Sequence, residues 1–319
     1  MSVALGRHRT NGRRACLRHL AVFAGMFVIS TPSRTSAQEP SMLSFQSAGA
    51  TLTYHILGSR TGTPLVVVAG GPGFDHGYMH LSPVWDSLAK TRPVVFYDQR
   101  GTGRASPFGP KDAATLTDFI GDLDALRQQL ATSRIDVLGH SWGGYLAMAY
   151  AARHPDRVDH VILVDAAAPK WSETIFLFNQ VFPEAIARQQ TFAFAEALGD
   201  TLAVQANIHE YLGMLFYSPA HRDAFLRDAA GLRYNQFLGR AMDADLARYD
   251  LGPELPKFRS PVLVITGRHD MNVAPLVAYR IHQAIPSSQF VVFERSGHLP
   301  FYEEPTEFVQ VVDRFLRLR

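Results

Sequence analysis

The stretch Gly139-His140-Ser141-Trp142-Gly143 contains a serine with the surroundings of a catalytic nucleophile. An apolar run at 135–138 precedes it and predicts a buried strand, and the run 145–152 that follows predicts a buried helix. A serine on a sharp turn between a strand and a helix is held in a strained backbone conformation that exposes its hydroxyl. The glycines on either side leave room for the neighbouring elements. Ser141 is therefore the candidate nucleophile.

Two later turns supply the partners that a serine nucleophile needs. A serine hydroxyl is weakly nucleophilic at neutral pH, so a histidine must take its proton and an acid must orient that histidine. Asp270 follows the apolar run 262–265, and His298 follows the apolar run 290–293. Both residues are expected on strand-end loops that face the same way as Ser141. Ser141, Asp270 and His298 are the predicted catalytic residues.

Each role has a rival in the sequence. Asp165 follows the apolar run 161–164 and is the alternative acid, although Asp270 occupies the commoner position for this arrangement. His140 adjoins Ser141 but is expected to point away from it, and His269 adjoins Asp270. We interpret both histidines as structural or surface residues.

Acyl transfer also needs two N–H donors directed at the negative charge of the tetrahedral intermediate, and losing one costs about 3 kcal/mol of transition-state stabilisation. We assign one donor to the backbone of Trp142. The other is assigned to Gly71, in the loop 69–73 after the apolar run 65–68, where glycines let the backbone approach a substrate closely. The alternative interpretation of this loop is a turn without a role in chemistry.

Short apolar runs alternate with helical patterns along most of the chain. Such runs are typical of strands covered on both faces, and the alternation predicts an α/β fold with a mostly parallel, doubly wound sheet. The segment 43–58 alternates around Gly49-Ala50 and predicts an antiparallel hairpin at the sheet edge. The expected strands contain the runs 65–68, 94–97, 135–138, 161–164, 262–265 and 290–293.

Helical patterns occur at four places between or after these runs. Tyr78, Leu81, Val84, Trp85 and Leu88 share one helical face, which predicts a helix over 78–88. The other three expected helices contain Phe119 to Leu130, Val277 to Ile285 and Phe308 to Phe315.

The interval 169–256 shows no strand pattern and is rich in aromatic and helix-forming residues. We predict an inserted helical subdomain there, placed over the carboxyl ends of the strands, where ligands bind in open α/β sheets. It is therefore the expected lid. The predicted domains are an export signal at 1–37, a first part of the core at 38–168, the lid at 169–256 and a second part of the core at 257–319.

The composition gives no support to nucleic-acid binding. The 319 residues carry 31 Lys and Arg against 29 Asp and Glu, a net charge of +2. Six of the arginines stand in the first forty residues, and without them the chain would be mildly acidic. The sequence shows no metal-ligand cluster, phosphate-binding loop or dinucleotide fingerprint, so we expect no cofactor and no metal.

The first 37 residues predict an export signal. A basic stretch through Arg18 precedes an apolar run at 20–29 and small polar residues that end in Thr35-Ser36-Ala37. The apolar run is shorter than the roughly 20 residues that span a bilayer, so we expect no stable membrane span in the mature chain.

The segment 12–18 resembles a twin-arginine signal, with Cys16 in place of the usual aromatic residue. An ordinary secretory signal or an uncleaved anchor are the alternatives. We expect a periplasmic or secreted protein that loses Cys16, its only cysteine, with the signal and then has neither a thiol nor a disulfide.

The chain resembles the α/β-hydrolase superfamily and, within it, the proline iminopeptidase group of serine peptidases. The resemblance covers nearly all of the expected mature chain apart from 169–256. It rests on Gly70-Gly71-Pro72-Gly73, Asp98-Gln99-Arg100-Gly101-Thr102-Gly103-Arg104-Ala105-Ser106, Ser141-Trp142-Gly143-Gly144, Gly297-His298-Leu299-Pro300-Phe301 and Glu303-Glu304-Pro305. It implies the α/β-hydrolase fold, an acyl-enzyme on Ser141 and release of N-terminal residues from short peptides. We interpret Asp98 and Arg100 as structural charges.

Two features depart from that group. Ala69 stands where the group usually has histidine before the Gly-Gly-Pro-Gly loop. The group also binds the free α-ammonium group of its substrate with acidic residues of the lid, and these are not matched here. We interpret the acidic residues considered in 169–256 as solvated helix charges: Glu173, Glu184, Glu196, Glu210, Asp223 and Asp228.

Two other functions remain open from the sequence. One is a carboxylesterase or lactonase that uses the same three residues and an apolar lid pocket. The other is a non-catalytic ligand-binding protein of the same fold. Epoxide hydrolases and haloalkane dehalogenases attack with aspartate, so Ser141 argues against both. The expected partner is a small molecule or a short peptide.

Overall fold

The computed structural model describes residues 42–59 and 61–318, and within them eight strands form one sheet in the order β1-β2-β4-β3-β5-β6-β7-β8. The expected α/β fold with a mostly parallel sheet is confirmed, because all six predicted apolar runs lie in strands. The strands are β1 (Leu43–Ser47), β2 (Ala50–Leu57), β3 (Leu65–Val68), β4 (Val94–Asp98), β5 (Ile135–His140), β6 (Val158–Val164), β7 (Val262–Gly267) and β8 (Gln289–Phe293).

Strands β1 and β2 form the antiparallel hairpin predicted at the sheet edge, and β2 also runs antiparallel to β4. The other neighbouring strands are parallel. The hairpin turns at Ala48 and Gly49, whose φ angles of 42° and 80° lie in the left-handed region that two-residue hairpin turns require. The parallel strands bring the turns after β5, β7 and β8 to one edge of the sheet.

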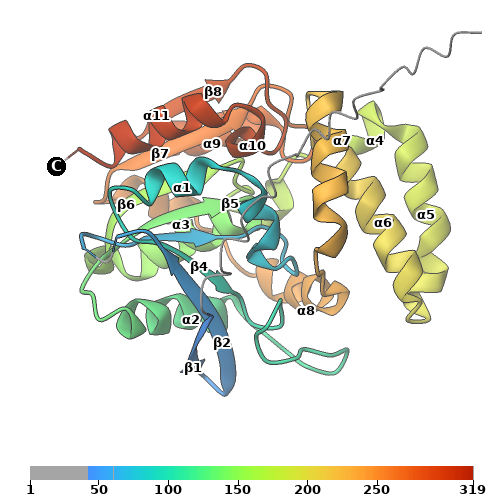
Figure 1. Ribbon diagram of the computed structural model, residues 1–319, viewed down its shortest axis with the longest axis horizontal. Coiled ribbons are helices and arrows are strands. Elements are labelled where there is room, and N and C mark those ends of the chain that lie inside the picture. The colour runs from blue at the N-terminus through green and yellow to red at the C-terminus, as the bar shows by residue number, and fades with distance from the viewer. Residues whose placement is uncertain (1–41, 60, 319) are drawn as a thin grey trace, which may run out of the picture. The chain divides into compact units, whose positions relative to one another are not determined.

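Helices cover both faces of the sheet, as Figure 1 shows. Helices α2, α3 and α9 pack on one face, and α1 and α11 pack on the other. Successive residues of β3 alternate between the two cores, Val66 and Val68 on one side and Leu65 and Val67 on the other. The bounds of the helices outside the interval 169–256 are α1 (Val84–Leu88), α2 (Leu116–Gln129), α3 (Trp142–Arg153), α9 (Pro275–Ala284), α10 (Pro300–Glu303) and α11 (Pro305–Phe315).

The prediction of a single helix over 78–88 is wrong, because two separate helices cover this segment. A 3-10 helix, η1, covers His76–Leu81, and the short helix α1 begins at Val84. Pro83 separates them, because its ring fixes φ and it has no N–H to continue the hydrogen-bonded ladder. The expected apolar face survives the break, since Tyr78, Val84, Trp85 and Leu88 are all buried.

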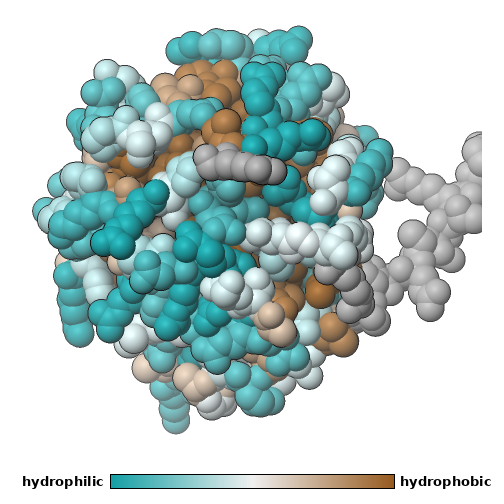
Figure 2. Space-filling model, turned by 90° about the vertical axis from the view of Figure 1, so that its left-hand side faces the viewer, coloured by the Kyte–Doolittle hydropathy of each residue, from teal (hydrophilic) through white to brown (hydrophobic). Residues whose placement is uncertain are grey.

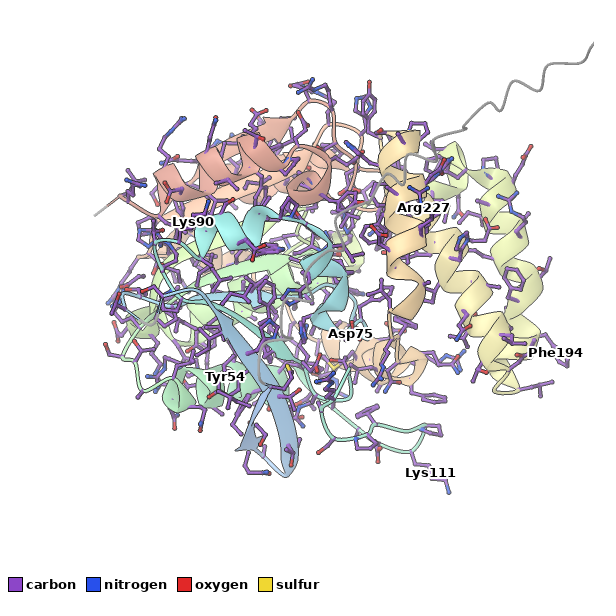
Figure 3. All side chains as sticks on the ribbon, viewed as in Figure 1. Tyr54, Asp75, Lys90, Lys111, Phe194 and Arg227 are labelled. Carbon is purple, nitrogen blue, oxygen red and sulfur yellow. The ribbon has the colours of Figure 1, made fainter. Side chains whose placement is uncertain are left out.

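The interval 169–256 is helical in the structure, and the described residues between β6 and β7 contain no strand. We call residues 169–256 the helical insertion. Helices α4 to α7 lie beside the sheet in Figure 1, and Phe194 projects outward from α5 in Figure 3, 76% exposed. Its α-helices are α4 (Phe178–Val181), α5 (Pro183–Ala197), α6 (Thr201–Gly213), α7 (Pro219–Asp228) and α8 (Gln236–Leu246).

Short 3-10 helices complete the structure: η2 (Pro155–Arg157), η3 (Trp171–Glu173), η4 (Ala229–Gly231) and η5 (Gly252–Lys257). No helix among the described residues combines the length and the apolar character that a membrane crossing requires. The side of the protein facing away from the insertion is mostly hydrophilic (Figure 2). The predicted export signal, 1–37, lies outside the described residues.

Candidate active site

Ser141 occupies the turn between the end of β5 at His140 and the start of α3 at Trp142. Its φ and ψ angles are 57° and −120°, a strained conformation for a residue with a Cβ. The flanking glycines allow this turn to form. A Cβ at Gly143 would collide with the carbonyl oxygen of Val68, and a Cβ at Gly139 would collide with the backbone of Gly143. The predicted strained turn is therefore present at Ser141.

Asp270 and His298 form a fully buried pair. Nδ1 of His298 lies 2.7 Å from Oδ2 of Asp270. The other carboxylate oxygen, Oδ1, accepts the backbone N–H groups of Asn272 and Val273 at 2.8 and 2.9 Å. Of the two candidate acids, Asp270 is thus the one that contacts the imidazole, and its own orientation is fixed by the turn that follows β7.

Nε2 of His298 has Asn272 as its partner. The Nδ2 amide of Asn272 lies 3.0 Å from Nε2 and 3.1 Å from the hydroxyl of Tyr211. Because an amide N–H donates, Nε2 is the unprotonated nitrogen and Nδ1 carries the proton shared with Asp270. This is the tautomer that a general base requires.

Within the described residues no hydrogen bond joins the hydroxyl of Ser141 to His298. The two residues nonetheless line one small pocket, together with Gly71, Phe74 and Tyr211. Catalytic hydrogen bonds are often absent or long without substrate and form in the substrate complex. For His298 to take the proton of Ser141, Nε2 must exchange Asn272 for the serine hydroxyl.

Burial controls the protonation of His298 and Asp270. It lowers the pKa of His298 from 6.5 to about 4, so the imidazole is neutral at neutral pH. Burial raises the pKa of Asp270 to about 7, while the hydrogen bonds from the N–H groups of Val273 and Asn272 oppose that rise. A neutral imidazole beside a buried acid can accept a proton and have the resulting charge stabilised.

Asp165, the rival acid, lies beneath the pair. Its Oδ1 accepts the hydroxyl of Thr266 at 3.0 Å and the N–H of Gly267 at 2.9 Å. Its side chain is completely buried, and burial together with the charge of Asp270 raises its pKa well above the usual range. Burial thus favours the protonated form of Asp165, and its hydrogen bonds hold it to the end of β7 rather than to the imidazole.

His140 is structural, as predicted from the sequence. Its Nδ1 lies 2.6 Å from the hydroxyl of Tyr78, and its Nε2 lies 2.8 Å from the backbone oxygen of His298. Although its nitrogens, Asp165 and His298 lie within 4.8 Å of one another, both nitrogens of His140 are already occupied. The imidazole therefore fixes the loop of His298 to the end of β5. His269, the other rival, stacks on Tyr217.

The loop expected to supply an N–H donor is held by side chains rather than by a histidine at position 69. Gln99 donates to the carbonyl of Ala69 at 2.9 Å and accepts the indole N–H of Trp142 at 2.9 Å. The N–H of Gly70 donates to Tyr78 at 2.6 Å. Within the described residues, the backbone N–H groups of Gly71 and Trp142 donate to no protein acceptor, which leaves both free for an outside oxygen.

Charges in the segment 98–106 brace this region, as interpreted from the sequence. Asp98 accepts the hydroxyl of Thr53 at 2.9 Å and the N–H of Arg104 at 2.8 Å. Arg100 forms a buried bidentate pair with Asp122 of α2, with both contacts at 2.7 Å. Neither Asp98 nor Arg100 lines the pocket that contains Ser141.

Glu303 holds the loop of His298 against the helical insertion. It accepts the N–H of Gly297 at 2.6 Å and the N–H of Ser218 at 2.8 Å. The adjacent Glu304 accepts the N–H of Arg295 and the hydroxyl of Ser296, both at 2.8 Å. The acidic pair after the motif of His298 is therefore a structural clamp.

A pocket of about 430 Å³ opens over Ser141 between the sheet edge and the helical insertion. Aromatic side chains form much of its wall: Phe74, Trp171, Phe176, Tyr211 and Tyr234. The insertion also contributes Glu196 from α5 and Arg240 and Asp243 from α8. The pocket thus combines an aromatic wall with charged groups in the same cavity as the candidate nucleophile.

Comparison with known proteins agrees with this geometry. A family model described as alpha/beta hydrolase fold matches residues 63–305. The chain belongs to the α/β-hydrolase family. It is similar to a proline iminopeptidase of Clostridium botulinum, with 30% identity over 82% of this chain and 93% of the relative.

Solved structures extend the likeness to other α/β-hydrolases. A thermophilic esterase from Thermogutta terrifontis, solved with malate bound, shares 25% identity with a TM-score of 0.66, covering 87% of this chain and 98% of that one. An enol-lactonase from Burkholderia xenovorans also shares 25% identity with a TM-score of 0.66, covering 86% of this chain and all of the other. The chain is a hydrolase of this family.

Sequence reasoning missed several residues of this α/β-hydrolase site. Asn272 and Tyr211 contact each other and line the pocket, and Asp243 lines it from α8. Asn272, two residues after Asp270, could have been found from that spacing. Glu196, interpreted from the sequence as a solvated helix charge, lies in the wall of this pocket. No local signal separates Glu196 or Asp243 from other helix charges, since only the packing of α5 and α8 determines which face meets Ser141.

Proposed function

We propose that this α/β-hydrolase is a serine aminopeptidase of the proline iminopeptidase type, which releases N-terminal residues, including proline, from short peptides. The observation that carries the proposal is the pair of insertion carboxylates, Glu196 and Asp243, in the pocket that contains Ser141. An aminopeptidase must bind a free α-ammonium group, and carboxylates beside an aromatic wall suit a cationic N-terminus and a proline ring. The sequence similarity to proline iminopeptidases points the same way.

In the proposed reaction the hydroxyl of Ser141 attacks the carbonyl carbon of the N-terminal residue while His298 takes its proton. Asp270 stabilises the imidazolium that forms. The oxygen of the tetrahedral intermediate accepts the N–H groups of Gly71 and Trp142. His298 then protonates the leaving amine, and water hydrolyses the acyl-enzyme by the same route in reverse.

The helical insertion acts in this proposal as a lid that closes the substrate pocket. Its contact with the loop of His298 through Glu303 supports that role, because the side chain joins Ser218 of the insertion to Gly297. We further propose that the protein is exported through the signal predicted at 1–37, on the sequence pattern given above.

The two substrate classes can be separated by comparing proline p-nitroanilide with a short-chain p-nitrophenyl ester. Glu196→Gln and Asp243→Asn should each lower kcat/KM for the anilide about 10- to 100-fold, since a hydrogen bond to a charged group contributes about 1.5–3 kcal/mol. Ester hydrolysis, which needs no α-ammonium contact, should change little. Glu184→Gln, on the same helix as Glu196 but outside the pocket, is the matched control.

A carboxylesterase or lactonase is the second candidate. The esterase and enol-lactonase structures similar to this chain favour it, as does the aromatic wall of the pocket. This function would replace the first if the ester were the far better substrate and neither carboxylate variant altered the ratio of the two activities.

A further inference from the structure

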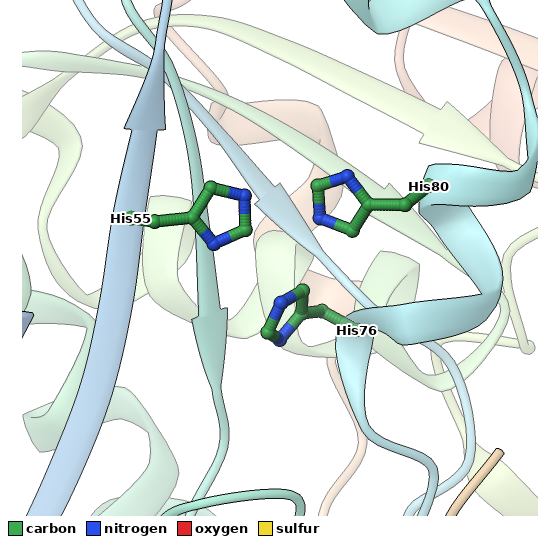
Figure 4. A group of neighbouring side chains, drawn as sticks. All are labelled: His55, His76 and His80. Carbon is green, nitrogen blue, oxygen red and sulfur yellow. The ribbon is translucent and has the colours of Figure 1, made fainter. Parts of the chain in front are cut away.

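Three histidines converge at a place that the proposed reaction does not use. His55 comes from β2, and His76 and His80 come from η1. Figure 4 shows their rings grouped together, and one nitrogen of each lies within 4.8 Å of those of the other two. Ring centroids are 4.7 to 5.1 Å apart. None of the three lines the pockets that contain Ser141, so the cluster is separate from the candidate active site.

Three of the six ring nitrogens of this cluster are buried without a protein partner. Both nitrogens of His55 and Nε2 of His80 are buried without a hydrogen bond. A buried polar atom left unsatisfied is destabilising, and these three atoms belong to two neighbouring rings. His55 is 2% exposed and stacks on Phe96 of β4 at 5.4 Å, so its ring cannot turn to solvent without losing that packing. A ligand between the rings would satisfy Nε2 of His80 and one nitrogen of His55.

His76 has the second contact that metal-binding histidines usually make. Its Nδ1 lies 2.7 Å from Oδ1 of the buried Asp98, which fixes the ring and directs Nε2 away from the carboxylate. A metal-binding histidine almost always donates its other N–H to a carboxylate or carbonyl, which raises the basicity of the binding nitrogen. Asp98 is itself held by Thr53 and by the backbone of Arg104.

We propose that His55, His76 and His80 form a binding site for a late first-row divalent metal ion, represented by Zn²⁺. Three imidazole nitrogens are typical ligands of Zn²⁺, Cu²⁺ and Ni²⁺, whereas Ca²⁺ and Mg²⁺ require oxygen ligands. Nitrogens around a tetrahedral zinc ion stand about 3.4 Å apart for bonds of about 2.0–2.1 Å. The three ligand nitrogens would therefore move closer to one another by about 1.4 Å at most on binding zinc. A water molecule would occupy the fourth coordination position of the ion.

A metal ion here would be structural. It would join β2 to η1, which follows directly on the loop that carries Gly71. The sequence reasoning expected no metal, because no single motif contains these residues: His55 stands 21 positions before His76. Only the packing of η1 against β2 brings the three together.

The test is a titration of the EDTA-treated, dialysed full-length protein with Zn²⁺ by calorimetry. The proposal predicts one bound ion per chain and a melting temperature that rises with the Zn²⁺ concentration. His55→Asn and His80→Asn should each weaken binding about 100-fold or more, since each removes one of three ligands. His160→Asn and His221→Asn, outside the cluster, should bind Zn²⁺ as the unaltered chain does.

Substitution at buried His55 can prevent folding, so the half-buried His80 provides a second variant. Binding of Co²⁺ to the unaltered protein provides a third measurement that needs no substitution. Bound Co²⁺ should give the intense visible absorption of a tetrahedral site, and Zn²⁺ should displace it. The proposal is overturned if the unaltered protein binds no Zn²⁺. It is equally overturned if binding persists in both variants and Zn²⁺ inhibits hydrolysis, which would place the ion at His298.

Discussion

His298 is the residue whose protonation state decides whether the proposed reaction can start. Its imidazole must be neutral to accept the proton of Ser141, and burial holds the pKa below the ordinary 6.5. Nδ1 is committed to Asp270, and Nε2 currently accepts from Asn272. Asp270 and Asn272 are therefore the side chains that hydrogen-bond to the two nitrogens of the base.

The pH dependence of kcat/KM follows from the protonation of the pair formed by His298 and Asp270. The reaction needs a neutral imidazole beside an ionised carboxylate, so activity falls when either residue of the pair takes up a proton. Burial lowers the pKa of His298 to about 4 but raises that of Asp270 to about 7, so the pair binds its first proton near pH 7 and the acid limb should lie there. Initial rates at low substrate concentration between pH 3 and 9 measure this limb. An acid limb near pH 4 would show that Asp270 stays ionised and that His298 alone sets the limb.

The identity of the candidate residues could be predicted from sequence, but their contacts could not. Ser141, Asp270 and His298 stand after apolar runs, so a pattern of strand and turn locates them. The hydrogen bond of Asn272 to Nε2 and the position of Asp165 beneath Asp270 depend on side-chain packing between β6, β7 and β8. No local pattern encodes such packing.

Between elements, the ion pair of Arg100 and Asp122 joins the loop after β4 to α2. Both side chains are buried, Arg100 at 9% exposure and Asp122 at 0%, and the pairing is bidentate. Helix α2 begins with a capping box between Thr115 and Asp118, which fixes where Asp122 falls along the helix. The pair therefore holds the segment 98–106 in place behind the pocket.

Arg100→Met should lower the free energy of unfolding by about 3–5 kcal/mol, because it leaves the carboxylate of Asp122 buried without its cation. The double variant Arg100→Met with Asp122→Leu should recover most of that loss, since no buried charge remains. Urea denaturation followed by circular dichroism measures all three. Arg317→Met, which removes an exposed pair with Asp313, is the control and should cost about 0–1 kcal/mol. Equal losses in the single and double variants would contradict this account.

Strands and helices could be predicted from the sequence where apolar residues form a continuous run or recur with a regular spacing. The six parallel strands and the edge hairpin follow from apolar runs and from alternation around the turn at Ala48 and Gly49. The prediction of one helix over 78–88 was wrong because it used the apolar periodicity alone and ignored Pro83. Pro83 has no N–H, so it ends the ladder of helical hydrogen bonds. The amphipathic pattern there reflects burial of both short pieces against the same side of the sheet.

At the scale of the whole molecule, the sheet supplies the candidate catalytic residues and the helical insertion supplies the pocket wall and its charges. The α/β-hydrolase fold could be predicted because each successive apolar run in the sequence corresponds to a strand of the sheet. The lining of the pocket could not be predicted, since the packing of α5 and α8 decides that Glu196 and Asp243 line the pocket that contains Ser141. In the proposed function, specificity therefore depends on the tertiary packing of the helical insertion.

Export of the chain is tested by fractionating a Gram-negative host that expresses it. The twin-arginine proposal predicts periplasmic protein that is shorter than the full chain by about 37 residues. Arg13→Lys with Arg14→Lys should leave full-length protein in the cytoplasm. Arg7→Lys with Arg9→Lys keeps the charge outside the motif and should be exported. Export of both double variants alike would favour an ordinary secretory signal.

The most direct test of the central claim is the site of covalent labelling by a fluorophosphonate, read by intact mass and peptide mapping. The account predicts one adduct per chain on the hydroxyl of Ser141, with loss of hydrolysis in proportion to labelling. Ser141→Ala should fold with an unchanged circular dichroism spectrum, accept no label and show no turnover. Hydrolysis retained by Ser141→Ala, or failure of the folded, unaltered protein to be labelled at Ser141, would contradict it.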